Sequence, residues 1–120
     1  MIYTHMHKGQ KQKPGYVYVI IDESQRIKLG YSNDADIRLH ELQIGNAEQL
    51  RVYQRLHVQD MVQAEKSLHI LFAPWHIRGE WFYLHEEARP LFNKIFLKQS
   101  TLNARELALL ESLGLRTIDL

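Results

Sequence analysis

Hydrophobic residues near the start of the chain form two segments that predict a β-hairpin. Residues 16–21 read Tyr-Val-Tyr-Val-Ile-Ile, a continuous β-branched and aromatic run that is typical of a central strand buried on both faces. Between residues 26 and 31, apolar side chains alternate with Lys28 and Gly30, which predicts a second strand. The polar turn at 22–25 is short, so the two strands should pair antiparallel.

The pattern then changes to helical spacing, returns to alternation, and becomes helical again. Capping residues at 32–34 precede a helix with an apolar stripe that ends at Gly45. Residues 50–58 alternate, which predicts a third strand with one apolar face and one face of arginines and aromatic rings. Asp60 opens the next helix, and the buried stripe of this helix consists of Met61, Ala64, Leu68 and Leu71.

The last part of the chain predicts a short aromatic segment and two helices. The aromatic segment covers residues 80–84, and residues 91–96 carry the apolar face of the first helix. Residues 103–106 resemble a capping box, and they begin a short leucine-rich helix that Gly114 closes. Its leucines could pack on the core of this chain or on a second copy to form a homodimer. The order of elements predicts an α/β (α+β) fold, with a small antiparallel three-stranded central sheet flanked by helices.

Length and composition restrict the class of protein. The chain has 120 residues, 45% of them hydrophobic and 24% charged, which is typical of one soluble globular domain. A formal net charge of +1 excludes a wholly basic nucleic-acid binder but allows a local basic face. The absence of cysteine excludes a disulfide, a thiol nucleophile and a cysteine zinc site. No apolar run approaches the ~20 residues of a membrane span, and no signal peptide is visible. We therefore expect a cytoplasmic protein without membrane contact.

Glu65 is the unusual position on the predicted helices. It lies at the edge of the apolar stripe, one helical turn from Met61, Leu68, His69 and Phe72. Removing even a polar group from water without a partner costs on the order of 2–7 kcal/mol. We therefore expect the rest of the chain to bring a cation to this carboxylate.

Two other residues, Arg38 and His69, have both ordinary and functional interpretations. Arg38 lies on the preceding helix, where surface ion pairs with Asp34 or Glu41 would contribute only about 0.3–0.5 kcal/mol and are common. His69 follows Glu65 by one helical turn and shares its face, but two ligands alone do not make a zinc site.

Three further arginines are candidate nucleic-acid-binding residues. Arg51 and Arg55 lie on the basic face of the third strand, which is about equally consistent with a solvated surface and with phosphate contact. Arg78 lies at the turn before the aromatic segment.

An ordered set of short motifs resembles the GIY-YIG nuclease family, in particular a subfamily of phage and microbial proteins. Val17-Tyr18 resembles part of the first motif, with Tyr16 in place of its glycine, and Lys28-Leu29-Gly30 resembles the second motif. Arg38 and Glu65 follow in the order of the family. The match continues through residues 79–82 (Gly-Glu-Trp-Phe), and the resemblance covers roughly residues 14 to 98.

This resemblance implies a metal-dependent endonuclease that hydrolyses phosphodiester bonds in DNA, with RNA left open as a substrate. Glu65 is implied to hold a single divalent ion, Mg²⁺ or Mn²⁺, and Arg38 to clamp the scissile phosphate. Tyr18 is implied to position or deprotonate the attacking water, and deprotonation requires a lowered phenol pKa. Lys28 and Tyr31 are implied to help activate the water or to bind the phosphate.

The sequence departs from the family at several positions around this chemistry. Lys28 replaces the tyrosine of the second motif, and Tyr31 is available to supply a phenol. No asparagine follows the Glu65 helix at 77–80, where Glu80 is either a second acidic contributor or the start of the aromatic strand. His69 is implied to relay protons or to support the ligand. Residues 81–82, Trp and Phe, are expected to pack inward rather than to stack on bases.

With this resemblance the chain divides into a flexible basic arm at 1–13, a GIY-YIG-like nuclease domain at 14–98, and a C-terminal helical extension at 99–120. Two alternatives stay open: a nucleic-acid-binding module of the same fold that cuts poorly, and a non-nucleic-acid interaction protein that dimerises. The joint presence of Tyr18, Arg38 and Glu65 favours an active enzyme over the first alternative. Salt-insensitive behaviour without DNA binding would indicate the second.

Overall fold

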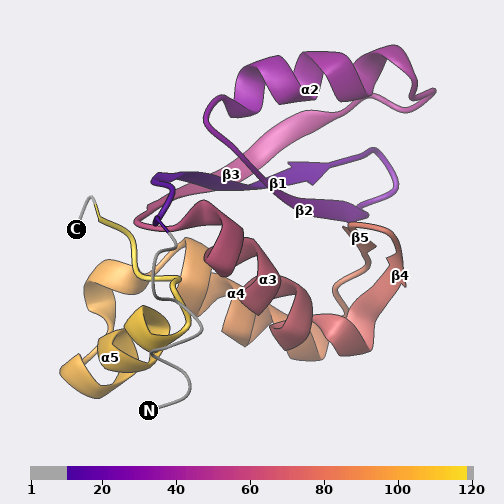
Figure 1. Cartoon of the computed structure of the whole chain (residues 1–120). Helices are drawn as coiled ribbons and strands as arrows, with labels where there is room; N and C mark the ends of the chain where they lie inside the picture. The colour runs from indigo at the N-terminus through magenta and orange to yellow at the C-terminus, as the bar shows by residue number, and fades with distance from the viewer. Residues whose placement is uncertain (1–10, 119–120) are drawn as a thin grey trace.

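The protein is built on one antiparallel sheet of five strands (Figure 1). It is represented by a computed structural model that describes residues 11–118. The strands are β1 (Gly15–Ile21), β2 (Ile27–Ser32), β3 (Arg51–Val58), β4 (His76–Arg78) and β5 (Trp81–Phe82), and their order across the sheet is β3-β1-β2-β5-β4. The predicted α+β class is confirmed, and β1 is the buried strand between β3 and β2 that its continuous apolar run indicated.

The sheet has two strands more than the three predicted. β5 has two residues and lies in the predicted aromatic strand, which the sequence did not assign to the central sheet, and β4 has three residues, too few to leave a recognisable alternation. β5 joins the sheet only through two pairs, Ile27↔Phe82 and Lys28↔Trp81. Residues 30–32 of β2 therefore extend beyond the end of β5, and this open edge of β2 becomes important below.

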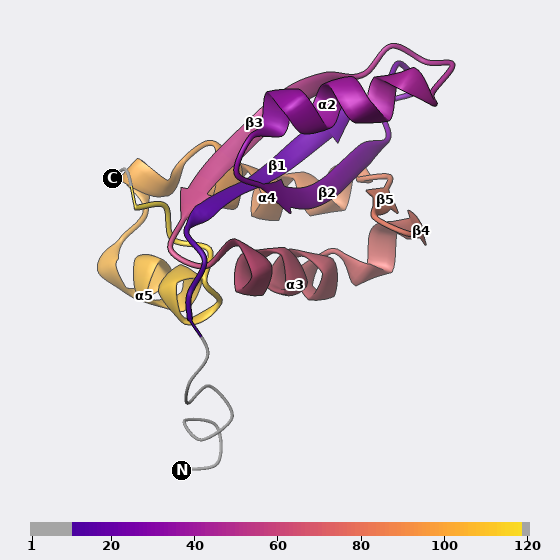
Figure 2. The ribbon, with the colours of Figure 1, turned by 45° about the horizontal axis from the view of Figure 1, so that its top comes forward.

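Helices cover both faces of the sheet. Helix α2 (Ala35–Ile44) lies on one face, and α3 (Met61–Leu71) and α4 (Arg89–Phe96) lie on the other, as the two views show (Figures 1 and 2). Helix α5 (Ala104–Ser112) packs at the end of the second layer. Short 3₁₀ turns at Ala73–Trp75, Glu86–Ala88 and Gln99–Thr101 connect these elements.

Local signals account for the helix boundaries. The side chain of Asp34 accepts hydrogen bonds from the backbone at the start of α2, and that of Asp60 does the same for α3. Asn103 and Glu106 form the predicted capping box at the start of α5. The caps expected from the sequence are therefore confirmed.

A β-bulge overturns the prediction of a single basic face on β3. The pairing of β1 with β3 shifts register between Val19 and Ile20, so one extra residue of β3 is accommodated there. Beyond the bulge the side chains change faces. Arg55 forms an ion pair with Asp36 of α2 at 3.5 Å, whereas Tyr53 stacks on Phe92 of α4, on the opposite side of the sheet.

Arg51 follows Tyr53 to the α4 side, because its guanidinium carbon lies 5.3 Å from the centre of the Tyr53 ring. The expectation that Arg51 and Arg55 share one face is therefore wrong. Strict alternation was assumed, and the bulge inverts it within the strand.

The C-terminal extension packs on the core of the same chain. Leu110 and Leu115 are buried in the larger hydrophobic cluster, between the sheet and α3. The Ser67 hydroxyl of α3 donates a 2.6 Å hydrogen bond to the Leu113 carbonyl, and Gln99 donates one to the Leu115 carbonyl at 2.8 Å. Of the two alternatives for the leucine-rich helix, the structure shows packing on the core.

Two further expectations concern the chain ends and the membrane. Residues 1–10 of the expected basic arm lie outside the described residues. Within residues 11–118, no helix combines the length and the apolar character that crossing a bilayer demands.

Candidate active site

The residues singled out from the sequence meet at the open edge of β2. Tyr18 and Lys28 come from the sheet, Arg38 from α2, and Glu65 from α3. Two contacts of Leu29 connect β2 with α3 and with the turn between β4 and β5. The His69 ring nitrogen Nε2 lies 2.9 Å from the Leu29 carbonyl, and the Leu29 amide donates a 3.0 Å hydrogen bond to the backbone carbonyl of Glu80.

Tyr18 and Gly30 are facing residues on β1 and β2, and their contact explains the glycine. A Cβ atom added at residue 30 would lie 2.4 Å from the Tyr18 hydroxyl oxygen and 2.5 Å from the ring carbon Cζ. No side chain fits under the ring. The glycine of the second motif therefore makes room for the tyrosine of the first, and the hydroxyl is directed across β2 toward its open edge.

Arg38 reaches the buried hydroxyl of Tyr18 from α2. Its guanidinium lies beside the phenol oxygen and contacts Glu41 at 3.3 Å. Both contacts raise the pKa of Arg38, so it carries its charge at any ordinary pH. Of the two surface partners expected for Arg38, Glu41 is observed, while the Asp34 side chain caps the helix.

The pKa of Tyr18 shifts upward, mainly because burial disfavours the phenolate and despite the opposing effect of Arg38. This direction opposes the lowered phenol pKa that deprotonation of water requires. The hydroxyl is therefore suited to orienting a nucleophile rather than to removing its proton.

Glu65 lies beside a second carboxylate, that of Glu80, where the sequence led us to expect a cation. The Glu65 side chain is only 15% exposed, and burial together with a hydrogen bond to Glu80 raises the pKa of the carboxyl group. Among the described residues, no lysine or arginine forms an ion pair with Glu65. The neighbours of Glu65 are instead a second carboxylate, Glu80, and the ring of His69, which is a cation only when it is protonated.

His69 also stands beside Glu65, with its Nε2 atom 3.9 Å from the carboxylate oxygen. The 2.9 Å contact between Nε2 and the Leu29 carbonyl requires a proton on Nε2, since a carbonyl oxygen can only accept. The lone pair of neutral His69 is therefore on Nδ1. The edge of the ring packs against Phe82 at 5.0 Å.

Lys28 is nearly buried and is the last member of the cluster at the β2 edge. This cluster consists of Tyr18, Lys28, Arg38, Glu65, His69 and Glu80. The Lys28 ammonium group lies 3.1 Å from the Glu80 carboxylate and 5.6 Å from the centre of the Trp81 ring. Phe82 is buried as expected, and Trp81 packs partly buried against the smaller hydrophobic cluster beneath α2. Ligand atoms of Glu65, His69 and Glu80 all lie within 4.8 Å of one another, so they could hold one metal ion.

Four other candidate residues lie on the strands around this cluster, and one of them, Arg55, is the cross-strand partner of Tyr18. Tyr31 is 42% exposed and alternates with Gly30, so it points to the sheet face opposite Tyr18. Arg51 and Arg55 are on β3, and Arg78 is on β4, at the two outer edges of the sheet. The three arginines do not form one surface, and their role in nucleic-acid binding stays a prediction.

The sequence left two interpretations of Glu80 open, a second acidic contributor or the start of the aromatic strand. Glu80 was therefore not among the predicted site residues. The available signal was Gly79, whose φ of +57° forms the turn between β4 and β5. This turn places Glu80 opposite Leu29, but the pairing of β5 with β2 that determines the placement is too short to see in the sequence.

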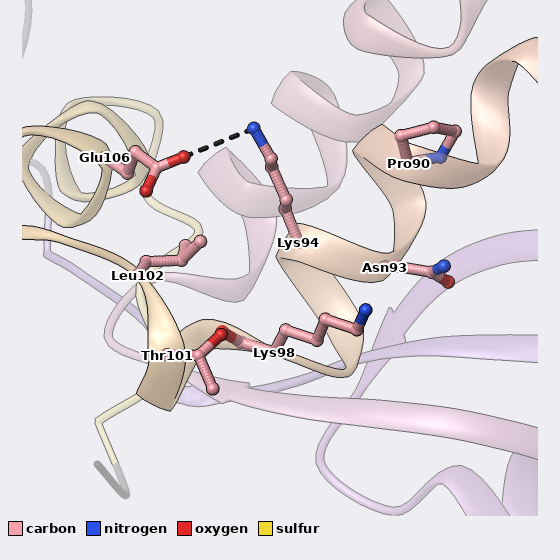
Figure 3. A pocket seen from close by; sticks show the side chains of 7 residues that line it. All are labelled: Pro90, Asn93, Lys94, Lys98, Thr101, Leu102 and Glu106. Atoms are coloured by element: carbon pink, nitrogen blue, oxygen red, sulfur yellow. Dashed lines mark hydrogen bonds and ion pairs between the residues drawn. The ribbon is translucent and has the colours of Figure 1, made fainter.

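A separate hollow of about 430 Å³ lies between α4 and α5 (Figure 3). It is lined by Pro90, Asn93, Lys94, Lys98, Thr101, Leu102 and Glu106. An ion pair of 3.2 Å between Lys94 and Glu106 crosses its rim. None of these residues belongs to the cluster at the β2 edge.

Comparison with known families identifies the family of this chain. The family model described as the T5orf172 domain matches residues 15–93, a segment that contains every member of the cluster at the β2 edge. No curated protein and no solved structure matches the chain.

Proposed function

Because the chain belongs to the T5orf172 domain family, which is found in phage and nuclease-like proteins, we propose that it is a metal-dependent endonuclease that hydrolyses DNA phosphodiester bonds by GIY-YIG chemistry. The observation that carries the proposal is the meeting of Tyr18, Arg38 and Glu65 from three separate elements at one open sheet edge. In this proposal the nuclease domain spans residues 14–98.

The surroundings of Glu65 fit a divalent ion. A half-buried carboxylate next to a second carboxylate is electrostatically unfavourable unless a proton or a cation lies between them. Mg²⁺ is commonly held by one or two carboxylates, with water and substrate phosphate as the other ligands. When bound, Mg²⁺ or Mn²⁺ supplies positive charge that stabilises the leaving oxygen and the charge on the phosphate.

Arg38 is the fixed cation of the proposed mechanism. Its guanidinium is held from one side by Glu41 and from another by the Tyr18 hydroxyl. A guanidinium positioned in this way can donate hydrogen bonds to two oxygens of the scissile phosphate, and it requires no reorganisation during the reaction.

Tyr18 orients the attacking water in this proposal. The neighbouring Arg38 guanidinium can only donate hydrogen bonds, so the proton of the Tyr18 hydroxyl is available to a neighbouring oxygen. Lys28, held by Glu80, adds a second positive charge for the phosphate. One such site cuts one strand, so cutting a duplex requires a homodimer or two successive visits.

The decisive experiment is cleavage of supercoiled plasmid and labelled branched DNA with Mg²⁺ or Mn²⁺, in which the wild type is compared with Glu65→Ala. Glu86→Ala is the matched control, because it removes an exposed glutamate on the Glu86–Ala88 turn. We expect nicking by the wild type and by the control, and none by Glu65→Ala.

Salt-dependent DNA binding without cutting by either protein would favour a binding module of the same fold. Equal cutting by wild type and Glu65→Ala would place the ion on another carboxylate. A protein that neither binds nor cuts nucleic acid would favour an interaction protein.

A further inference from the structure

Glu80 is held at the site by the backbone around it. Gly79 adopts the left-handed conformation that the turn requires, and the His76 ring contacts the Gly79 carbonyl at 2.8 Å. The Glu80 carbonyl accepts the 3.0 Å hydrogen bond from the Leu29 amide. The main chain of Glu80 is therefore fixed to β2, and its side chain is presented to α3.

This position makes Glu80 a poor contributor to folding stability. Its carboxylate lies beside that of Glu65, and one lysine, Lys28, provides the only ion pair of the two carboxylates with a Lys or Arg among the described residues. Two like charges in a partly dry environment repel each other, and a single monovalent partner leaves one of them unbalanced. The arrangement calls for more positive charge than the chain supplies.

We propose that Glu80 is a second ligand of the divalent ion held by Glu65. The inference rests on the proposed function, which supplies the ion, and it adds the residue that the sequence motifs left without a role. Two carboxylates from α3 and the β4–β5 turn would bind the ion at the junction of the two layers.

The same geometry excludes the Nε2 atom of His69 as a ligand atom and leaves only its Nδ1. Its Nε2 atom faces Glu65 but carries the proton given to the Leu29 carbonyl, so this nitrogen has no lone pair to offer. Lys28 instead competes with the ion, because its ammonium group occupies the Glu80 carboxylate at 3.1 Å.

The neighbouring Trp81 gives a direct readout of binding. Tb³⁺ is a hard cation that uses oxygen ligands, as Mg²⁺ does, and its luminescence is excited through a nearby indole ring. The Trp81 ring is close to the Glu80 carboxylate, since the Lys28 ammonium contacts both. Titration of the whole chain with Tb³⁺, without DNA, measures ion affinity independently of activity, and Trp81→Phe identifies the sensitising ring.

Three single variants separate the possibilities. Glu65→Gln and Glu80→Gln each remove one proposed ligand, and Glu86→Gln removes an exposed carboxylate as the matched control. We expect both ligand variants to bind Tb³⁺ at least about tenfold more weakly than the wild type, by analogy with the 10–100-fold losses at supporting residues of metal sites. The control should bind as the wild type does.

Wild-type affinity in Glu80→Gln together with weak binding in Glu65→Gln would overturn the inference and leave the proposed function intact. If the wild type gives no saturable Tb³⁺ signal, the chain does not bind the ion, and the proposed metal-dependent function is refuted as well. Far-UV circular dichroism checks the fold of each variant.

Two further variants keep the test decisive if Glu80→Gln fails to fold. Glu80→Asp retains a carboxylate and should recover part of the affinity. Lys28→Met removes the competing ammonium group and should strengthen Tb³⁺ binding. Weaker Tb³⁺ binding by this variant would contradict the competition and would mean that Lys28 holds the Glu80 side chain in place.

Discussion

Replacement of Gly30 by alanine tests the packing that places the Tyr18 hydroxyl at the site. The new Cβ would lie 2.5 Å from Cζ of the ring and 2.4 Å from the hydroxyl oxygen. Carbon atoms in contact are normally about 3.5–4.0 Å apart, so the ring must move by about 1 Å or more. Tyr18 is buried, which leaves little room for that movement.

The expected cost follows from core overpacking, which is typically about 1–3 kcal/mol. At about 4 °C per kcal/mol for a domain of this size, Gly30→Ala should lower the melting temperature by about 4–12 °C. Because the phenol is displaced, plasmid nicking should fall as well. Gly45→Ala is the matched control, since a Cβ at residue 45 has nothing within 4 Å, and we expect a change within about 0.5 kcal/mol.

A double-mutant cycle identifies the cause of the loss. Tyr18→Leu removes the ring atoms that clash, so adding Gly30→Ala in that background should cost far less than it does in the wild type. The coupling free energy should reach about 1–3 kcal/mol, measured by urea denaturation of the four proteins. An unchanged cost in the Tyr18→Leu background, or a Gly30→Ala protein as stable as the wild type, would refute the steric explanation.

Three other predictions follow from the same structure. Tyr18→Phe keeps the buried ring but removes the hydroxyl beside the site arginine, so single-turnover nicking should slow about 10²-fold with little change in melting temperature; an unchanged rate would contradict its role. The pKa of Glu65 is raised by burial and by Glu80, so its contribution to stability is present at low pH and is lost as pH rises through the folded-state pKa. In the absence of divalent ions, Glu65→Gln should therefore have a higher urea midpoint than the wild type at pH 7, and the two should converge below about pH 4.3. Leu110→Ala should lower the free energy of unfolding by about 2–5 kcal/mol at any protein concentration, because Leu110 is buried in its own chain. Leu109→Ala is the control: its side chain is 62% exposed, so the free energy of unfolding should change by no more than about 0.5 kcal/mol. A loss for Leu110→Ala that depends on protein concentration would indicate a dimer.

Much of the fold is predictable because its signals are local. Asp34, Asp60 and Asn103 cap their helices through hydrogen bonds to residues two or three positions away, so each start can be seen in a short window. The continuous apolar run of β1 likewise identifies the strand that is covered on both faces.

Local patterns fail where pairing between distant segments decides the outcome. The bulge opposite Val19 and Ile20 turns Arg51 and Arg55 to opposite faces, and strict alternation cannot anticipate it. β4 and β5 are too short to show a period, and they exist because β2 offers an edge on which they can pair.

The sequence by itself determined which chemical groups are available: a tyrosine in a buried strand, an arginine on one helix, a glutamate at the edge of the apolar stripe of the next helix, and the order of the motifs that carry them. Only the tertiary structure decided which groups meet. It placed Gly30 beneath the Tyr18 ring and brought Glu80, rather than a lysine or arginine, to the side of Glu65. The physical reason is that capping and periodicity act over a few residues, whereas strand pairing and layer packing join residues far apart in the chain, and no short window of sequence records them.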